Sequence, residues 1–174
     1  MSSPANVSFA LLDAPVIRGR AEDPVVPAMT HARLLEEAAA LGGVLHHFGV
    51  GPGTPVVLDL DDDLDAVVAA LATARIGGVV TTQDDPAAPV VVVSTGSAIP
   101  AAGRIRMVRG RDVAEPDLDW SVMLRAGRTD PAACEVLEPG AAYSPGRSVA
   151  EQLEVLAGTS APYDAAELRR LLQV

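Results

Sequence analysis

Residues 30–82 read THARLLEEAAALGGVLHHFGVGPGTPVVLDLDDDLDAVVAALATARIGGVVTT, and this stretch decides the fold of the chain. Its first part predicts a helix, because apolar residues recur at alternating spacings of four and three and so share one helical face. These residues are Leu34, Ala38, Leu41, Leu45 and Phe48. Thr30 is the predicted N-cap, and Gly49 is placed to end the helix in a left-handed conformation.

The second part of the stretch predicts a strand, a helix and another strand. Residues 56–60 form a short apolar strand after a turn rich in Gly and Pro. Asp62 is the expected N-cap of the next helix, with Asp65 at the position of a capping-box acid. That helix ends at a Gly-Gly pair, and residues 79–82 form the next strand. Strand, helix and strand in this order predict a right-handed parallel crossover.

Further strands and helices are expected along the rest of the chain. Val90 to Val93 is a continuous β-branched run, typical of a strand buried on both faces of a parallel sheet. Residues 105–108 are another candidate strand, and residues 120–126 form a short helix. The chain therefore predicts a parallel sheet of four or five strands.

Two capped helices are expected in the carboxy-terminal tail. Ser148 with Glu151, and Asp164 with Glu167, stand at the capping-box spacing. The apolar residues of these helices need a surface to cover, which is either the sheet of their own chain or a second one. These residues are Leu153, Leu156, Leu168, Leu171 and Leu172.

We expect one α/β domain over residues 1–174, because a chain of this size buries roughly 70% of its unfolded surface and can form one core. Residues 1–28 are predicted to be irregular, apart from an apolar run, Phe9 to Leu12, that can open a helix. Residues 29–138 form the α/β core and residues 139–174 a helical tail. The expected fold is a small, mostly parallel sheet with helices on both faces.

The composition argues against several classes of partner and location. A net charge of −10 makes nucleic acid and anionic membrane surfaces poor partners, since phosphate binding depends on basic groups. The one cysteine, Cys134, excludes an internal disulfide and fits a reducing cytoplasm, and without a predicted His partner it is interpreted as a passive small residue. The amino terminus has no targeting signal, and no segment reaches the ~20 apolar residues of a spanning helix.

Residues 30–82 resemble the opening subdomain of the adenylate-forming superfamily, which includes the acyl-CoA synthetases. That subdomain has a capped helix that ends in a Leu-Gly-Val turn, a Gly-Asp-like turn, a hydrophobic strand, an Asn or Asp cap, and an Ala-rich helix that ends in Gly-Ala or Gly-Gly. The matching parts here are His47 to Val50, Gly51 to Thr54, Val56 to Leu60, Asp62, and Ala66 to Gly78. Residues 117–143 are similar to the linker before the phosphate loop of acetyl- and propionyl-CoA-type synthetases.

The sequence departs from the family where nucleotide chemistry is concerned. The family's phosphate loop is rich in Ser, Thr and Gly and carries a lysine, whereas residues 142–147 read AYSPGR and the whole chain has no lysine. The family's later nucleotide-binding motifs and catalytic lysine have no room before Val174. The resemblance therefore implies a chain truncated before the phosphate loop, without catalytic residues or a cofactor that can be assigned.

Ser94, Thr95, Gly96 and Ser97 are the candidate ligand-binding residues. They follow a predicted buried strand, and the carboxyl ends of parallel strands are where α/β sheets hold ligands. A Gly-containing turn can also present backbone amides to an anion. The alternative is an ordinary polar turn, since the spacing of a Walker loop and its lysine are missing.

Three other groups of residues are candidate sites. The acidic run from Asp59 to Asp65 lacks the glycine and distal glutamate of a calcium loop, and a strand end followed by a helix cap explains it better. His46 and His47 are adjacent, so on a helix they point about 100° apart and do not share a metal. Arginines at positions 104, 106, 109 and 111 fall on two faces of a strand, which leaves a solvated edge or an anion site. No metal is predicted.

Two functions remain open at this point. The favoured hypothesis is a non-catalytic relative of the acyl-CoA synthetases that acts in protein interaction or regulation. Its partner would be a second copy, as in a homodimer, or another synthetase-like protein, because a lone subdomain would expose apolar surface. The alternative is a module, or a residual enzyme, that binds an acyl, CoA or nucleotide group near Ser94 to Ser97.

Overall fold

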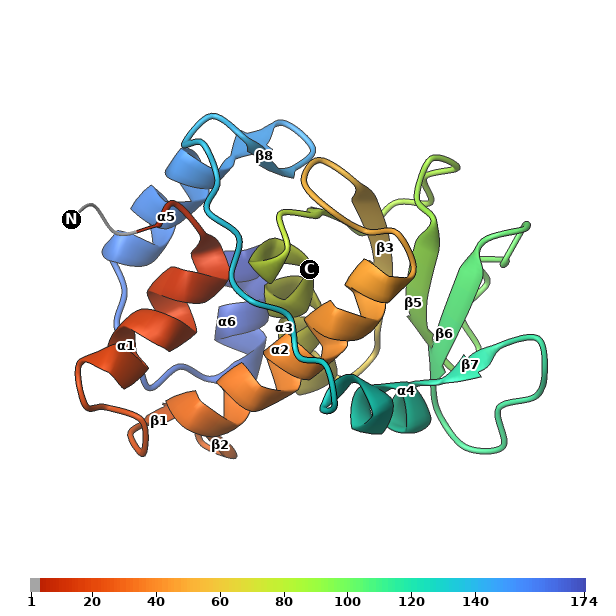
Figure 1. Cartoon of the computed structure of the whole chain (residues 1–174), viewed down its shortest axis with the longest axis horizontal. Coiled ribbons are helices and arrows are strands. Elements are labelled where there is room, and N and C mark those ends of the chain that lie inside the picture. The colour runs from red at the N-terminus through yellow and green to blue at the C-terminus, as the bar shows by residue number, and fades with distance from the viewer. Residues whose placement is uncertain (1–3) are drawn as a thin grey trace.

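The main sheet of the protein has five parallel strands in the order β4-β3-β5-β6-β7 (Figure 1). The computed structural model describes residues 4–174. The strands are β3 (Pro55–Asp59), β4 (Val79–Thr81), β5 (Val90–Ser94), β6 (Ile105–Arg109) and β7 (Leu118–Asp119). The predicted α/β fold with a small parallel sheet is therefore confirmed.

The order of the strands creates a switch point between β3 and β5. After β3 the chain crosses through a helix to β4 on one side, and it then returns to β5 on the other side of β3. Every residue of β5 is buried, as expected for a β-branched strand in the middle of a parallel sheet. In open α/β sheets, such a reversal leaves a crevice at the carboxyl ends of the two central strands.

Five helices lie where the sequence predicts helices, and four of them begin at the predicted caps. The five are α2 (His31–His47), α3 (Asp63–Arg75), α4 (Trp120–Gly127), α5 (Val149–Ala157) and α6 (Ala165–Leu172). The Thr30 side chain accepts a hydrogen bond from the Arg33 amide, and Gly49 has φ +86° just beyond α2. Ser148 and Glu151 form the predicted reciprocal capping box.

Asp62 caps α3, but Asp65 is not a capping-box acid. One Asp62 carboxylate oxygen accepts hydrogen bonds from the amides of Leu64 and Asp65. The Asp65 carboxylate is 2.7 Å from Nε of Arg109, at the end of β6. The Asp65 carboxylate, which the local pattern assigns to the helix cap, therefore binds the Arg109 guanidinium instead.

The helices pack against one face of the sheet, whereas the sequence predicts helices on both faces. The buried side chains of α2 to α6 form one cluster with Val56, Leu58 and Val92. The opposite face packs through Val57, Val91, Val93 and Val108 against three residues from connecting segments. These three residues are Ala88, Ile99 and Val113. Figure 1 shows the labelled helices gathered to one side of β5 and β6.

The segment expected to be irregular contains a helix. Residues 7–17 are helical, with a π-helical turn at Phe9–Asp13 followed by α1 (Ala14–Ile17), and β1 (Pro24–Val26) then pairs with β2 (Met29–Thr30). Asn6 explains the position of this helix. Its Oδ1 accepts from the amides of Ser8 and Phe9, and its Nδ2 donates to backbone carbonyls at positions 74, 75 and 135. The helix start is thus fixed by contacts far away in the sequence.

The tail folds onto the core of its own chain. Leu168 and Leu172 of α6 are fully buried in the main cluster, and the Tyr143 hydroxyl donates to the Leu172 carbonyl at 2.8 Å. Two short strands, β8 (Ala142–Ser144) and β9 (Arg147–Ser148), form a hairpin before α5. Within residues 4–174, no helix has both the length and the hydrophobicity needed to cross a bilayer.

Candidate functional site

The four residues predicted as a ligand site lie together in one turn at the switch point. Ser94 ends β5, the Ser97 amide donates to the Ser94 carbonyl at 3.1 Å, and Gly96 has φ +95°. This turn lies beside the carboxyl end of β3, because Ser94 Oγ accepts from the Asp61 amide at 2.8 Å. The placement is the one that the sequence predicts, and a role in binding stays a prediction.

The hydroxyl groups of the turn already have partners. The Ser97 hydroxyl donates to a carboxylate oxygen of Asp59. The Thr95 amide and hydroxyl both donate to the Arg109 carbonyl, at 3.1 and 3.4 Å. These bonds join the turn after β5 to the last residues of β3 and β6. The Ser97 hydroxyl hydrogen is already donated to the Asp59 carboxylate, so a phosphate could accept it only by displacing Asp59.

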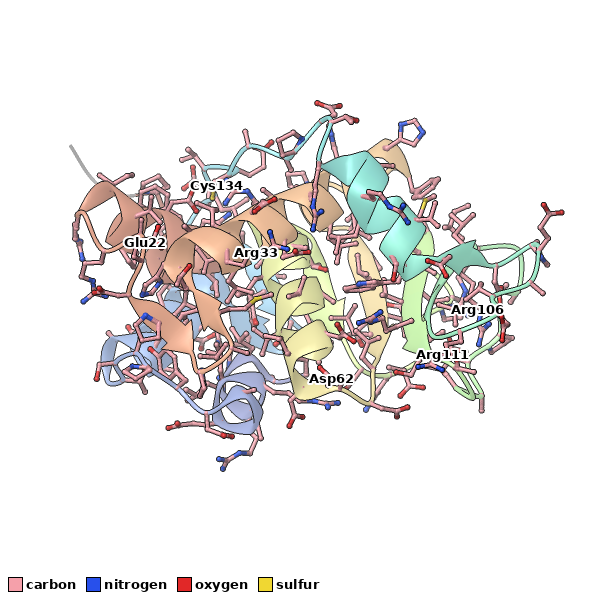
Figure 2. All side chains as sticks on the ribbon, turned by 90° about the horizontal axis from the view of Figure 1, so that it is seen from below. Glu22, Arg33, Asp62, Arg106, Arg111 and Cys134 are labelled. Carbon is pink, nitrogen blue, oxygen red and sulfur yellow. The ribbon has the colours of Figure 1, made fainter. Side chains whose placement is uncertain are left out.

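The acidic run is explained by a cap and by ion pairs. Asp62 caps α3, Asp63 is 2.9 Å from Nη1 of Arg169, and Asp65 binds Arg109. Figure 2 shows Asp62 at the amino end of α3. In the part of the chain that the structure describes, no group of three or more His, Cys, Asp or Glu side chains is arranged to hold a metal ion.

The arginines of the 104–111 cluster do not form one basic patch. Arg104 pairs with Asp84 at 2.7 Å, and Arg106 pairs with Asp117. Arg106 and Arg109 have opposite parity along β6 and therefore point to opposite faces of the sheet. Arg109 is paired with Asp65 in the same way. An aspartate thus neutralises each of these three arginines, which favours a structural edge over an anion site.

A cavity of about 390 Å³ lies between α3 and α4, and none of the four turn residues lines it. Its wall includes Leu64, Val68 and the buried Trp120, together with Arg109. Arg109 is held there by Asp65 and by the Ser121 hydroxyl at 3.3 Å. The cavity is therefore lined partly by apolar side chains and partly by charged ones, of which Asp65 and Arg109 pair with each other.

The residues at the expected phosphate-loop position form a tight hairpin. Only Pro145 and Gly146 join β8 to β9. Ser144 is buried and hydrogen-bonds to the side chain of Gln173, while Arg147 donates to Gln152 at 3.1 Å. Pro145 has no amide hydrogen, so this turn presents few donors to an anion.

Cys134 has the character of a passive residue. Burial raises the pKa of its thiol to about 11, despite the opposing effect of the nearby Arg75 guanidinium. The thiol is therefore protonated at neutral pH and a poor nucleophile. Cys134 lies on the segment that runs along α2, as Figure 2 shows.

Sequence reasoning missed His31, the first residue of α2. His31 is 2% exposed, and its Nδ1 is 2.9 Å from the Leu11 carbonyl. A signal was present, because His31 precedes Leu34 and Ala38 at spacings of three and four and so shares the buried face of the helix.

Comparisons with known proteins agree with this fold. Residues 17–89 match the family model described as AMP-binding enzyme. Over 84 residues the chain is 37% identical to the nonribosomal peptide synthetase inpB of Emericella nidulans, covering 46% of this chain and 4% of that protein. Residues 17–89 are thus similar to AMP-binding enzymes.

Solved structures of a CoA ligase and an acyl-CoA synthetase share the fold of this chain. The anthranilate CoA ligase AuaEII, in complex with anthranoyl-AMP, has a TM-score of 0.68 at 19% identity, over 83% of this chain and 32% of that one. The acyl-CoA synthetase of Brucella canis has a TM-score of 0.61 at 18% identity, over 82% and 31%. The chain thus spans about a third of the length of these enzymes.

Proposed function

We propose that this chain is a non-catalytic relative of the acyl-CoA synthetases that works in the cytoplasm by binding protein, either a second copy of itself or another synthetase-like chain. The observation that carries the proposal is the hairpin at Ser144 to Arg147. It stands where the resemblance places the phosphate loop, and it is built in a way that disfavours phosphate binding.

Phosphate binding needs several backbone amides and a positive charge that converge on one point. Pro145 removes an amide from the two-residue turn, and the Ser144 hydroxyl is engaged by Gln173. The nearest cation, Arg147, is held by Gln152. Since the chain also has no lysine, the hairpin lacks the groups that would stabilise the charge of ATP.

An apolar groove supports the interaction part of the proposal. A cavity of about 390 Å³ lies between the end of α2 and α4 and is lined mainly by apolar atoms, including those of Val44, Phe48 and Met123. Val122, next to the groove on α4, is 49% exposed. Apolar residues that gather at the surface in this way are typical of interaction sites.

The first test is an assay of ATP-dependent acyl-adenylate formation, with a panel of carboxylic acids and the purified chain. We expect no adenylate above background, and adenylate formation would refute the non-catalytic part. The second test is sedimentation of the purified chain with and without Val122→Asp. We expect a self-associated wild type and a monomeric variant, with Val155→Asp, an exposed position on α5, as the matched control.

The second candidate is a module that binds an acyl, CoA or nucleotide group at Ser94 to Ser97. The position of this turn at the switch point favours it, because ligands of open α/β sheets bind there. Calorimetric titration with ATP and with CoA tests it. A saturable signal that is lost in Gly96→Pro would support binding, since Pro cannot adopt the φ of +95° found at Gly96. A flat titration in the millimolar range would eliminate it.

A further inference from the structure

A third cavity, separate from the one between α3 and α4 and from the α2–α4 groove, is lined in part by a buried histidine. Its volume is about 390 Å³, and it lies between the amino-terminal helix, the start of α2, and the segment that joins α5 to α6. Most of its wall is apolar, with Leu11, Pro15, Leu153 and Leu156 among its residues. His31 contributes the buried polar group of interest.

The tautomer of His31 follows from its partner. Nδ1 is 2.9 Å from the Leu11 carbonyl oxygen, which can only accept a hydrogen bond, so Nδ1 carries the proton. An α-helical turn would pair the Leu11 carbonyl with the amide of residue 15, but that residue is Pro15 and has no amide hydrogen. The proline thus leaves an acceptor to which the imidazole can donate.

The other ring nitrogen, Nε2, is buried without a hydrogen-bond partner in the part of the chain that the structure describes. With the proton on Nδ1, Nε2 has a lone pair and can only accept. Burial is the largest effect on His31 and lowers its pKa, which keeps the ring neutral at neutral pH. A buried polar atom without a partner is uncommon in proteins and unfavourable, so an acceptor left open beside a cavity points to a ligand.

The neighbouring hydroxyls add a second acceptor. Thr159 donates its hydroxyl hydrogen to the Leu156 carbonyl at 2.8 Å. The Tyr163 hydroxyl, 3.1 Å away, must therefore donate to Thr159, and its own lone pairs remain free to accept. The cavity accordingly offers hydrogen-bond acceptors among apolar side chains, and Arg18 and Arg20 also contribute to its wall. The acceptors suit a mostly apolar molecule with a hydroxyl or a similar donor.

We propose that this cavity binds a small phenol or a similar apolar molecule whose hydroxyl hydrogen is donated to Nε2 of His31. The size suits the proposal, since ligand pockets range from roughly 300 to 1,000 Å³ and are mostly apolar with few polar groups. The inference does not depend on the proposed protein-binding function, because the cavity lies away from the α2–α4 groove.

The test compares phenol with anisole, which has the same ring but no hydroxyl hydrogen. Each is titrated into the full chain labelled with ¹⁵N-histidine, and the Nε2 resonance of His31 is followed by NMR. We expect phenol to shift this resonance and to bind about tenfold more tightly than anisole, as a hydrogen bond to a buried acceptor implies. Equal affinities, or no shift of His31 Nε2 up to about 20 mM phenol, would overturn the proposal.

His31→Asn is the matched variant, because an asparagine amide can still donate to the Leu11 carbonyl while no atom replaces Nε2. We expect the preference for phenol over anisole to disappear in this variant. His46→Asn makes the same chemical change at an exposed position of the same helix, and there the preference should persist. A preference retained in folded His31→Asn would also overturn the assignment, and the wild-type NMR titration decides the matter if this variant does not fold.

Discussion

The ion pair between Arg75 and Asp13 joins parts of the protein that are far apart in sequence. Nη1 and Nη2 of Arg75 donate to the two Asp13 carboxylate oxygens at 2.8 and 3.1 Å. Nε of Arg75 donates to the Ala132 carbonyl at 2.7 Å. The side chains are 8% and 17% exposed. The pair therefore fixes the amino-terminal helix and the segment around Ala132 to the end of α3.

Asp13→Ala should destabilise the fold by about 3 kcal/mol. Removal of one partner of a buried pair costs roughly 3–5 kcal/mol, because the remaining charge is left without compensation. The lower end applies here, since Arg75 keeps its bond to the Ala132 carbonyl and Asp13 has some contact with solvent. For a domain of this size the loss corresponds to a fall in Tm of about 6–12 °C.

Urea unfolding followed by circular dichroism measures the effect, and a double-mutant cycle with Arg75→Met isolates the pair. We expect the double variant to be more stable than the sum of the single changes implies, by about 2 kcal/mol. Glu36→Ala, which breaks an exposed pair with Arg33, is the control and should cost under about 1 kcal/mol. Additive single effects, or a loss for Asp13→Ala no larger than the control's, would refute the reasoning.

Three further predictions follow from close packing and burial. Gly127→Ala should cost about 3 kcal/mol in urea unfolding, because its Cβ would lie 2.1 Å from the Ala40 carbonyl oxygen, whereas Gly140→Ala meets no atom within 4 Å and should be neutral. At pH 8, Cys134 of the native protein should react with iodoacetamide about 100-fold more slowly than Cys134 of the urea-unfolded chain. The reason is that burial raises the pKa of the native thiol to about 11. Equal rates would contradict this prediction. The free energy of unfolding should fall more steeply below about pH 6.5 in the wild type than in His31→Asn. The unfolded histidine takes up a proton in this range, whereas burial and Arg20, opposed by Asp23 and the Leu11 carbonyl, keep the pKa of folded His31 lower. Equal slopes between pH 7 and pH 5.5 would count against this prediction.

The sequence determined the elements whose signals are local. Thr30, Asp62 and Ser148 cap helices through backbone amides two or three residues away, so short patterns contain all the information needed. The β-branched run from Val90 is a buried strand for a similar reason, because its side chains fit only an interior position. The turn at Ser94 to Ser97 was also placed correctly at the carboxyl edge of the sheet.

Features that depend on distant partners arise only in the folded protein. Asp65 has a capping-box position in the sequence, but Arg109 lies close enough in the fold to bind its carboxylate. The helix over residues 7–17 is fixed by bonds of Asn6 to carbonyls up to 129 residues away, which no local pattern encodes. The gathering of the helices on one face is likewise a property of the assembled sheet.

The same division holds for His31. Its spacing before Leu34 gave its face on the helix, and hence its burial. The hydrogen bond to the Leu11 carbonyl and the open Nε2 beside a cavity arise only when the amino-terminal helix packs against α2. Local propensity fixes which groups a segment presents, whereas the partners of a buried polar group are set by packing between segments distant in the chain.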